Sequence, residues 1–217
     1  MSSIETTLNE RDAAPGERLY GVYPAVVTDI RDPSNQGRVK IALPDAAAGP
    51  GHAAWARLAT LMAGRNRGSW FLPDVNDEVL VAFEGGDPRR PYVVGSLWNA
   101  SAQPPQSMDA AGHNNRKVLR SRNGVTLTLD DQDGTEQMIL ETPGGQKVTL
   151  KDGPGAIVIE DANGNSIKLA TAGITVTASM VTVNAGMSVF SGALKADTVI
   201  ANSVISASYT PGAGNIW

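Results

Sequence analysis

Four carboxylates flank one short apolar run and are the side chains best placed in this sequence for acid–base chemistry. Asp77 and Glu78 lie at the start of the run, and Glu84 and Asp87 follow it. A pair of carboxylates roughly 5 to 10 Å apart is the machinery of glycoside hydrolysis. Successive strand residues point to opposite faces, so Asp77 and Glu78 diverge, and the Glu84–Pro91 stretch has the composition of a turn. We therefore expect rim structure here, not a catalytic pair.

No other pattern indicates catalysis or a metal site. His52 lies in a Gly/Pro-rich loop and His113 in a polar segment, and neither has a cluster of ligand types beside it, so we expect two ordinary exposed histidines. The absence of cysteine excludes thiolate catalysis and disulfides. Neither a Gly-x-Ser-x-Gly elbow nor a Gly-Lys-Ser/Thr phosphate loop is present. We expect no catalytic residue, no metal and no cofactor.

Two pairs of arginines occupy predicted turns. Arg65 and Arg67 lie in a turn bounded by glycines, and Arg89 and Arg90 follow an Asp-Pro pair. Charges at loop tips either dock a protein partner or are simply solvated, and both readings are open at this level. The docking hypothesis names these four arginines as the contacts.

Three of the tryptophans, Trp55, Trp70 and Trp98, could stack on bases or sugars. The net charge is −4 and the isoelectric point is near 5.2, whereas a nucleic-acid binder shows a basic face. A nucleic-acid module would also bind oligonucleotides in a salt-sensitive manner. We expect no nucleic-acid partner and predict that these three rings belong to the core of a domain.

The aromatic residues are concentrated in the first half of the chain. Hydrophobic residues make up 41% of the 217 residues but aromatics only 5%, and eight of the eleven rings lie between Tyr20 and Trp98. None occurs from Asn99 to Val189. Large rings bury about 150–250 Å² each in an ordinary core. The second half must therefore build its core from aliphatic residues or share one with another chain.

The first half carries five strand-like runs separated by turns rich in Gly, Pro and Asp. The runs are Gly21–Asp29, Gly37–Leu43, Ala53–Leu61, Glu78–Phe83 and Tyr92–Leu97. Five short strands of this kind are typical of a small barrel of the oligonucleotide/oligosaccharide-binding type. We predict an all-β protein with a flexible tail over residues 1–17, a barrel over 18–100 and a linker over 101–117.

In the second half, turn glycines recur every 8–11 residues between short alternating runs. The runs are Val125–Leu129, Met138–Leu140, Val148–Leu150, Ile157–Ile159, Ile167–Leu169 and Ile174–Val176. This pattern is typical of a meander or a solenoid. Each strand offers one thin apolar stripe, so a single chain would enclose little. Three chains around one axis would enclose a narrow aliphatic core, which predicts a homotrimeric intertwined β-helix, or β-prism, over residues 118–217.

The distal part of this predicted needle is almost free of charge. Residues 171–217 carry only Lys195 and Asp197, and an uncharged end crosses a lipid layer at a lower desolvation cost. The uncharged stretch Leu169–Leu194 is long enough to span a bilayer, but its alternation indicates a strand. The N-terminus lacks the apolar segment of a signal peptide. We expect contact with a membrane to be transient.

Several short motifs follow one another in order along the chain, namely Val27–Pro33, Gln36–Ile41, Ala56–Thr60, Gly68–Pro73, Asp77–Phe83, Val94–Asn99 and Arg122–Asp131. This ordered set resembles the phage baseplate assembly protein V family, the spikes of contractile tails, and the related valine-glycine repeat protein G (VgrG) of type VI secretion. No single motif is specific. Their order and spacing carry the resemblance, which runs from about residue 20 to the C-terminus.

The resemblance implies a trimer with one barrel per chain and a shared β-helical needle. Such a spike sits at the baseplate tip of a phage tail, a tailocin, an extracellular injection system or a type VI machine, and sheath contraction drives it through the target envelope. It would be assembled in the bacterial cytoplasm and then become part of a virion or an injection particle. The chain has no room for a hub domain before the barrel, so a separate hub protein and the baseplate are the partners that Arg65, Arg67, Arg89 and Arg90 would face.

The resemblance also bears on enzymatic activity and on the tip. The chain has no lysozyme insertion between barrel and needle, so we expect no enzyme. It has no His-x-His motif near the C-terminus, so the iron site of some small spikes is not expected. The C-terminus is similar to needles that carry a separate proline-alanine-alanine-arginine (PAAR) repeat cone. The residues predicted to dock this cap are Tyr209, Pro211, Asn215, Ile216 and Trp217.

A trimeric receptor-binding or depolymerising tail spike is the alternative function. A depolymerase would need a longer helix with a cleft lined by carboxylates and aromatic rings. The 91 consecutive residues without an aromatic ring argue against such a cleft.

Overall fold

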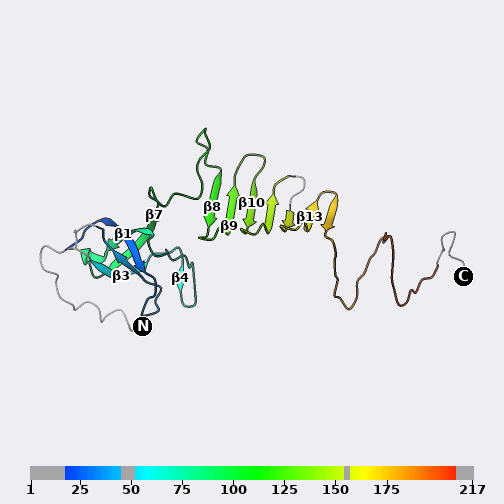
Figure 1. Cartoon of the computed structure of the whole chain (residues 1–217), viewed down its shortest axis with the longest axis horizontal. Coiled ribbons are helices and arrows are strands. Elements are labelled where there is room, and N and C mark those ends of the chain that lie inside the picture. The colour runs from blue at the N-terminus through cyan, green and yellow to red at the C-terminus, as the bar shows by residue number, and fades with distance from the viewer. Residues whose placement is uncertain (1–17, 45–51, 154–156, 209–217) are drawn as a thin grey trace.

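The computed structural model describes residues 18–44, 52–153 and 157–208. A small barrel comes first, a flat sheet of consecutive strands follows, and an extended segment continues beyond the sheet, so the chain is laid out from one end to the other (Figure 1). Apart from a single 3₁₀ turn at Glu84–Gly86, the regular elements of the described residues are strands. The all-β class predicted from the sequence is confirmed.

The barrel closes through five strands in the order β1-β2-β3-β7-β6. Their bounds are β1 Val22–Asp29, β2 Val39–Ala42, β3 Ala53–Leu58, β6 Glu78–Phe83 and β7 Pro91–Leu97. Strands β3 and β7 pair in parallel, and the other neighbours pair antiparallel. Each predicted run of the first half corresponds to one of these strands.

The barrel core is built from small aliphatic side chains. Along β6, buried and half-buried residues alternate, as a strand with one face inward requires. The buried cluster consists of Leu19, Ala25, Val27, Val39, Ile41, Leu43, Ala56, Val79, Val81, Phe83 and Val93. Its one aromatic ring, Phe83, meets the half-buried Tyr23 edge-on at 5.8 Å.

The prediction that the tryptophans fill this core is wrong. Trp70 is 73% exposed and Trp98 is 70% exposed. Trp55 is half-buried and lies under the Arg38 guanidinium, 5.8 Å from the ring centroid. A barrel of five short strands has an interior wide enough for Val and Ile but not for several indoles, so the indoles lie on the outside.

A short hairpin projects from the barrel between β3 and β6. It consists of β4 Ala63–Gly64 and β5 Arg67–Gly68, and it forms where the sequence predicted only a turn. In Figure 1 the hairpin is drawn on the side of the barrel toward the second sheet.

The second sheet is a seven-stranded antiparallel meander in sequence order, β8 to β14. The strands are β8 Arg116–Arg120, β9 Thr126–Asp130, β10 Gln137–Glu141, β11 Lys147–Lys151, β12 Ile157–Glu160, β13 Ser166–Ala170 and β14 Gly173–Thr177. Strand β8 begins two residues inside the predicted linker. Beyond β14, residues 178–208 run as an extended, exposed chain that forms no strand with the described residues (Figure 1).

Three matching five-residue turns join alternate strand pairs: Ser121–Val125, Thr142–Gln146 and Asp161–Asn165. In each, a side-chain oxygen of the first residue accepts a hydrogen bond from the backbone N–H of the fifth, at 3.0, 3.3 and 2.9 Å. The fourth residue is a glycine with φ of 90°, 84° and 84°, a conformation that favours glycine. The meander therefore repeats every two strands.

The turns of this row also stack on one another. A Cβ atom on Gly124 would lie 3.3 Å from the Pro143 side chain, and one on Gly145 would lie 3.1 Å from the Ala162 Cβ. Gly124 and Gly145 thus leave room for the next turn at the spacing that strand pairing sets.

Candidate functional site

One face of the meander carries almost all of its aliphatic side chains. Directly paired residues of neighbouring strands share a face, so the pairing registers sort the residues into rows. The first row is Leu119, Leu127, Leu140, Val148, Ile159, Ile167 and Val176. The second row is Leu129, Met138, Leu150, Ile157, Leu169 and Ile174. We call these thirteen residues the apolar face.

The opposite face of the meander is suited to water. It presents mainly threonines and charged residues, with Val118, Ile139 and Val158 as its aliphatic members. Opposite charges meet across strands: Arg116 Nε lies 3.0 Å from Asp130 Oδ2, and Lys147 Nζ lies 3.5 Å from Glu160 Oε1. A sheet with one apolar and one polar face needs a layer over the apolar one.

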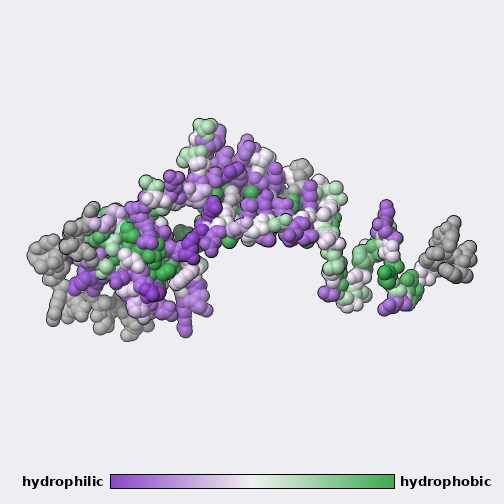
Figure 2. Space-filling model, viewed as in Figure 1, coloured by the Kyte–Doolittle hydropathy of each residue, from purple (hydrophilic) through white to green (hydrophobic). Residues whose placement is uncertain are grey.

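Nothing in the described part of the chain covers the apolar face. Leu140, Ile159 and Ile167 are exposed, and two grooves run along the two rows. The extended segment after β14 is equally bare, with Ile200 96% exposed, and its green patches in Figure 2 face solvent. A monomer rarely exposes a contiguous apolar patch on this scale, which marks it as an interaction site.

The four arginines proposed as docking charges do not form one patch. Arg65 and Arg67 belong to the β4–β5 hairpin, which follows β3 and precedes β6. Arg89 and Arg90 follow β6 and precede β7, so they lie at the other end of the barrel. Six strand residues span about 20 Å, which separates the two pairs.

Arg89 and Arg90 are engaged with nearby carboxylates. Arg89 Nη2 lies 2.8 Å from Asp87 Oδ2, and Arg90 Nη1 lies 3.9 Å from Glu84 Oε1. The hydrogen bonds from Arg89 hold the pKa of Asp87 at about 2, below its ordinary value. The turn is therefore a fixed structure with guanidinium groups on its surface.

The four carboxylates considered for acid–base chemistry bond to separate partners. Glu78 accepts a hydrogen bond from Asn99 Nδ2 at 2.7 Å, and Glu84 accepts one from the Tyr92 hydroxyl at 2.7 Å, which raises the pKa of Tyr92. Asp77 accepts a bond from the backbone N–H of Asp74 at 2.8 Å. The four groups sit at the rim of the barrel, on both ends of β6.

Among the described residues of the barrel, Asp32 has a heavily bonded side chain, although the sequence points to it only as a turn residue. Its side chain is 4% exposed and lies 2.7 Å from Arg38 Nη2. It also accepts backbone N–H bonds from Ser34, Gln36 and Arg38. These bonds, the one from Arg38 first, lower the pKa of Asp32. The signal was available, because Asp before Pro and Ser is a typical start of a side-chain-capped turn.

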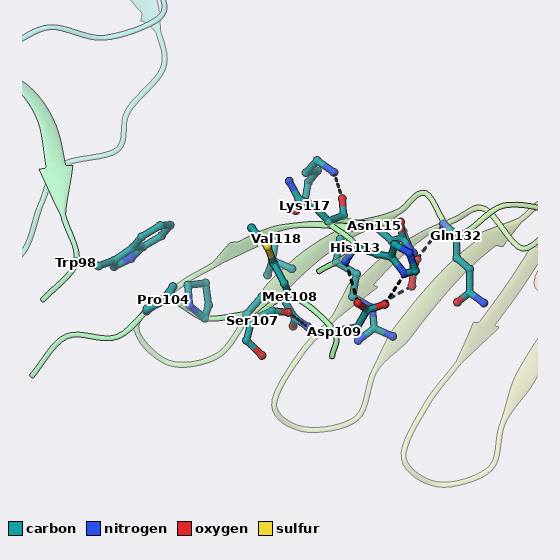
Figure 3. A pocket seen from close by; sticks show the side chains of 15 residues that line it. Trp98, Pro104, Ser107, Met108, Asp109, His113, Asn115, Lys117, Val118 and Gln132 are labelled. Carbon is teal, nitrogen blue, oxygen red and sulfur yellow. Dashed lines mark hydrogen bonds and ion pairs between the residues drawn. The ribbon is translucent and has the colours of Figure 1, made fainter. Parts of the chain in front are cut away.

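The segment between barrel and meander folds along β8 and leaves a hollow lined by Trp98, Pro104, Met108 and β8 (Figure 3). His113 is anchored there: its backbone N–H donates to Asp109 Oδ1, and its Nδ1 lies 2.8 Å from Asp109 Oδ2. These bonds lower the pKa of Asp109. Over the described residues no group of three metal-ligating side chains gathers.

His52, which the sequence placed in an ordinary exposed setting, is half-buried in the structure. Its Nε2 lies 3.0 Å from the carbonyl oxygen of Pro88. This contact ties the start of β3 to the turn that carries Arg89.

An ion pair ties the barrel to the first turn of the meander: Arg122 Nη1 lies 2.9 Å from Asp74 Oδ1. The predicted cap-docking residues Tyr209, Pro211, Asn215, Ile216 and Trp217 lie outside the described residues. Within residues 18–44, 52–153 and 157–208, no helix is long and apolar enough to cross a membrane.

Two family descriptions match the chain, one for each body. Residues 23–98 match the type VI secretion system/phage-baseplate injector OB domain. Residues 137–203 match the phage baseplate V C-terminal trimerisation domain. The first match covers the barrel, and the second covers β10 to β14 together with most of the extended segment.

Curated relatives show the same similarity. The chain is 30% identical over 104 residues to the type VI secretion system spike protein VgrG1b of Pseudomonas aeruginosa, covering 45% of this chain and 14% of that protein. It is 30% identical over 141 residues to VgrG4b of the same species, covering 58% and 17%. It is 32% identical over 112 residues to the actin cross-linking toxin VgrG1 of Vibrio cholerae, covering 48% and 10%. The chain thus spans less than a fifth of these relatives' length.

Proposed function

Because the chain belongs to the phage-baseplate V and VgrG spike family, we propose that it is the central spike at the baseplate tip of a contractile injection machine. In this proposal three copies share one needle, which begins at β8 and continues through the predicted range of residues 118–217, and each copy contributes one barrel at its base. Sheath contraction drives the needle through the target envelope.

The observation that carries the proposal is the uncovered apolar face. Full burial of a Val, Leu or Ile side chain contributes roughly 1.5–3 kcal/mol. Twelve of the thirteen residues of the apolar face are of these types, and all thirteen are only half-buried or exposed in one chain, so covering them stabilises an assembly. Three meanders that turn their apolar faces to a common axis bury all of these residues and leave the charged faces in water.

The extended segment supports the same assembly. Residues 178–208 continue the alternation of small polar and aliphatic residues, yet they pair with no strand among the described residues. Backbone N–H and C=O groups that are removed from water need partners. In the proposed trimer the partners are the equivalent segments of the other two chains, wound around the axis as an intertwined β-helix.

The low charge of the distal needle fits passage through a membrane. Past β13 the described residues carry only Lys195 and Asp197 as charged side chains. Charged groups are the most costly to remove from water, so the distal needle enters lipid more readily than the proximal meander does. Contact with the target membrane is transient in this proposal.

The partners of the spike are also part of this proposal. We assign the barrel end with Arg89 and Arg90 to a separate hub protein, because β7 leads from that end toward the needle. Arg65 and Arg67 would face other baseplate or tube components, and Tyr209, Pro211, Asn215, Ile216 and Trp217 would dock a PAAR-type cap. The chain carries no catalytic step in this proposal, whatever toxin activity a longer relative carries.

Sedimentation of the purified chain, with and without SDS at room temperature, tests the proposal. A shared needle predicts an elongated trimer that resists SDS, because every strand of the needle contacts other chains. A compact particle that SDS dissociates at once into single chains would overturn the spike assignment.

A further inference from the structure

The hairpin that leaves the barrel carries a second uncovered apolar surface. We call residues Leu61–Phe71 the arm. Its four large apolar side chains are exposed, namely Leu61 (99%), Met62 (54%), Trp70 (73%) and Phe71 (74%). The needle does not account for this surface, because the arm belongs to the barrel.

The arm is a fixed structure. The Thr60 hydroxyl donates to the Ser69 carbonyl at 3.0 Å, the Ser69 N–H donates to the Met62 carbonyl at 2.9 Å, and the Met62 N–H donates to Ser69 Oγ at 3.1 Å. A Cβ atom on Gly68 would lie 2.6 Å from the Met62 carbonyl oxygen. The crossed bonds at its base hold the apolar side chains in one place, as a docking surface requires.

One edge of the Trp70 ring is held against the barrel. A Cβ atom on Gly37 would lie 3.0 Å from that ring, so the absence of a side chain at Gly37 lets the indole lie on the β1–β2 loop. The remaining ring surface faces outward together with Phe71.

The arm lies at the needle end of the barrel. The residues that follow it lead to Asp74, which pairs with Arg122 in the first turn of the meander at 2.9 Å. That turn ends at Val125, which lines the groove on the apolar face. Through Asp74 and Arg122 the arm thus leads to the end of the apolar face that lies nearest the barrel.

We propose that the apolar side chains at the base of the arm pack against a second copy of this chain, so that three arms form an apolar collar where the barrels meet the needle, while Arg65 and Arg67 farther out on the hairpin stay outside the collar. The proposal rests on the trimeric spike proposed above. A hub protein is not the occupant we choose, because the end of the barrel assigned to it lies across β6 from the arm. The collar would fix the rotation of each barrel about the axis, which the exposed Asp74–Arg122 pair alone cannot do.

The chain contains no cysteine, which permits a direct test on the full-length protein. Leu61→Cys places one thiol on the arm, and Arg90→Cys places one at the opposite end of the barrel as the matched control. Leu61 is almost fully exposed, so neither the barrel core nor the needle should be disturbed. Each variant is treated with a short bismaleimide at micromolar concentration, and its sedimentation is measured before the reaction.

The collar predicts that both variants sediment as trimers, that Leu61→Cys gives covalent dimers on a denaturing gel, and that Arg90→Cys gives at least tenfold less. Trimers in which Leu61→Cys links no better than Arg90→Cys would overturn the collar and leave the spike intact. The collar would also be overturned, and the spike left intact, if Leu61→Cys were cross-linked to an added hub protein in place of a second copy. Sedimentation of both variants as single chains would overturn the collar and the spike together.

Discussion

The barrel and the meander cover their apolar side chains in opposite ways. Both are built from short strands of Val, Ile and Leu, and both lack large rings in their apolar layers apart from Phe83. The barrel closes on itself and buries its core within one chain, with Val27, Ile41 and Val79 at 0% exposure. The meander stays open, and its best aliphatic ladder remains uncovered. Similar strands thus give a self-sufficient domain when the sheet closes and an assembly surface when it does not.

The largest expected effect comes from placing a charge on the apolar face. Leu150→Asp should abolish the trimer at micromolar concentration, because three carboxylates would be buried near one axis without partners. Its neighbour Thr149 points to the polar face, so Thr149→Asp is the matched control and should leave the trimer intact. Sedimentation of the two variants measures whether each of them still forms a trimer. Equal loss of the trimer in both would show that the two faces do not differ as described.

A cavity in the barrel core should act on the barrel alone. Ile41 is fully buried among aliphatic side chains, so Ile41→Ala should cost about 2–5 kcal/mol. Calorimetry should show a barrel transition lowered by about 10 °C or more and an unchanged needle transition. If the barrel and the needle unfold in one transition that shifts as a whole, the two do not unfold independently.

The stacked turns offer a smaller and more local test. Gly145→Ala puts a Cβ into a left-handed position and 3.1 Å from Ala162, whereas Gly134→Ala meets the same backbone preference with nothing within 4 Å. Each substitution should lower the free energy of unfolding by about 1 kcal/mol because of the backbone conformation. Gly145→Ala should lower it further because of the contact with Ala162. Thermal denaturation of the two variants measures the difference, and equal losses would show that stacking contributes nothing.

The smallest expected effect is a loss of barrel stability at low pH. Asp29 and Asp87 in the barrel have a pKa of about 2, held down by Arg31 and Arg89, and the pKa of Asp32 is lowered by Arg38. A pKa below the unfolded value of about 3.9 means that the unfolded chain takes up protons first. The stabilisation is therefore present above about pH 4 and is lost as the pH falls toward 2.

The measurement is a pH series of barrel melting for the parent chain and for Asp32→Asn. The parent should lose barrel stability between pH 4 and 2, while the variant starts lower and changes less over the same range. A barrel whose melting temperature is independent of pH in this window would contradict the role given to these pairs.

Much of the fold could be predicted because local chemistry agrees with it. The strand β6 alternates from Glu78 to Phe83, and glycines such as Gly124 and Gly145 mark the turns of the meander. Strand β8 was less visible, since Arg116–Arg120 is rich in charge and becomes a strand through its pairing with β9. The sequence predicts only a turn at the arm, because two-residue strands leave no periodic signal.

The site was predictable in outline and not in detail. The thin apolar stripes indicated a shared core, but the two rows of the apolar face depend on the register of six strand pairs. Trp70 and Trp98 lie outside the predicted core because hydrophobicity alone favours burial of a ring and does not show that the narrow barrel interior has no room for it. Asp before Pro and Ser predicts the turn at Asp32, but not its bonds to Arg38, which lies six positions away in a loop of specific shape.

The mass of the purified chain in solution tests the central claim most directly. Light scattering at micromolar concentration should give about three times 22.7 kDa, because only shared burial covers the apolar face. A stable particle of 22.7 kDa that stays monomeric on concentration would contradict the account, since the face would then be bare in water.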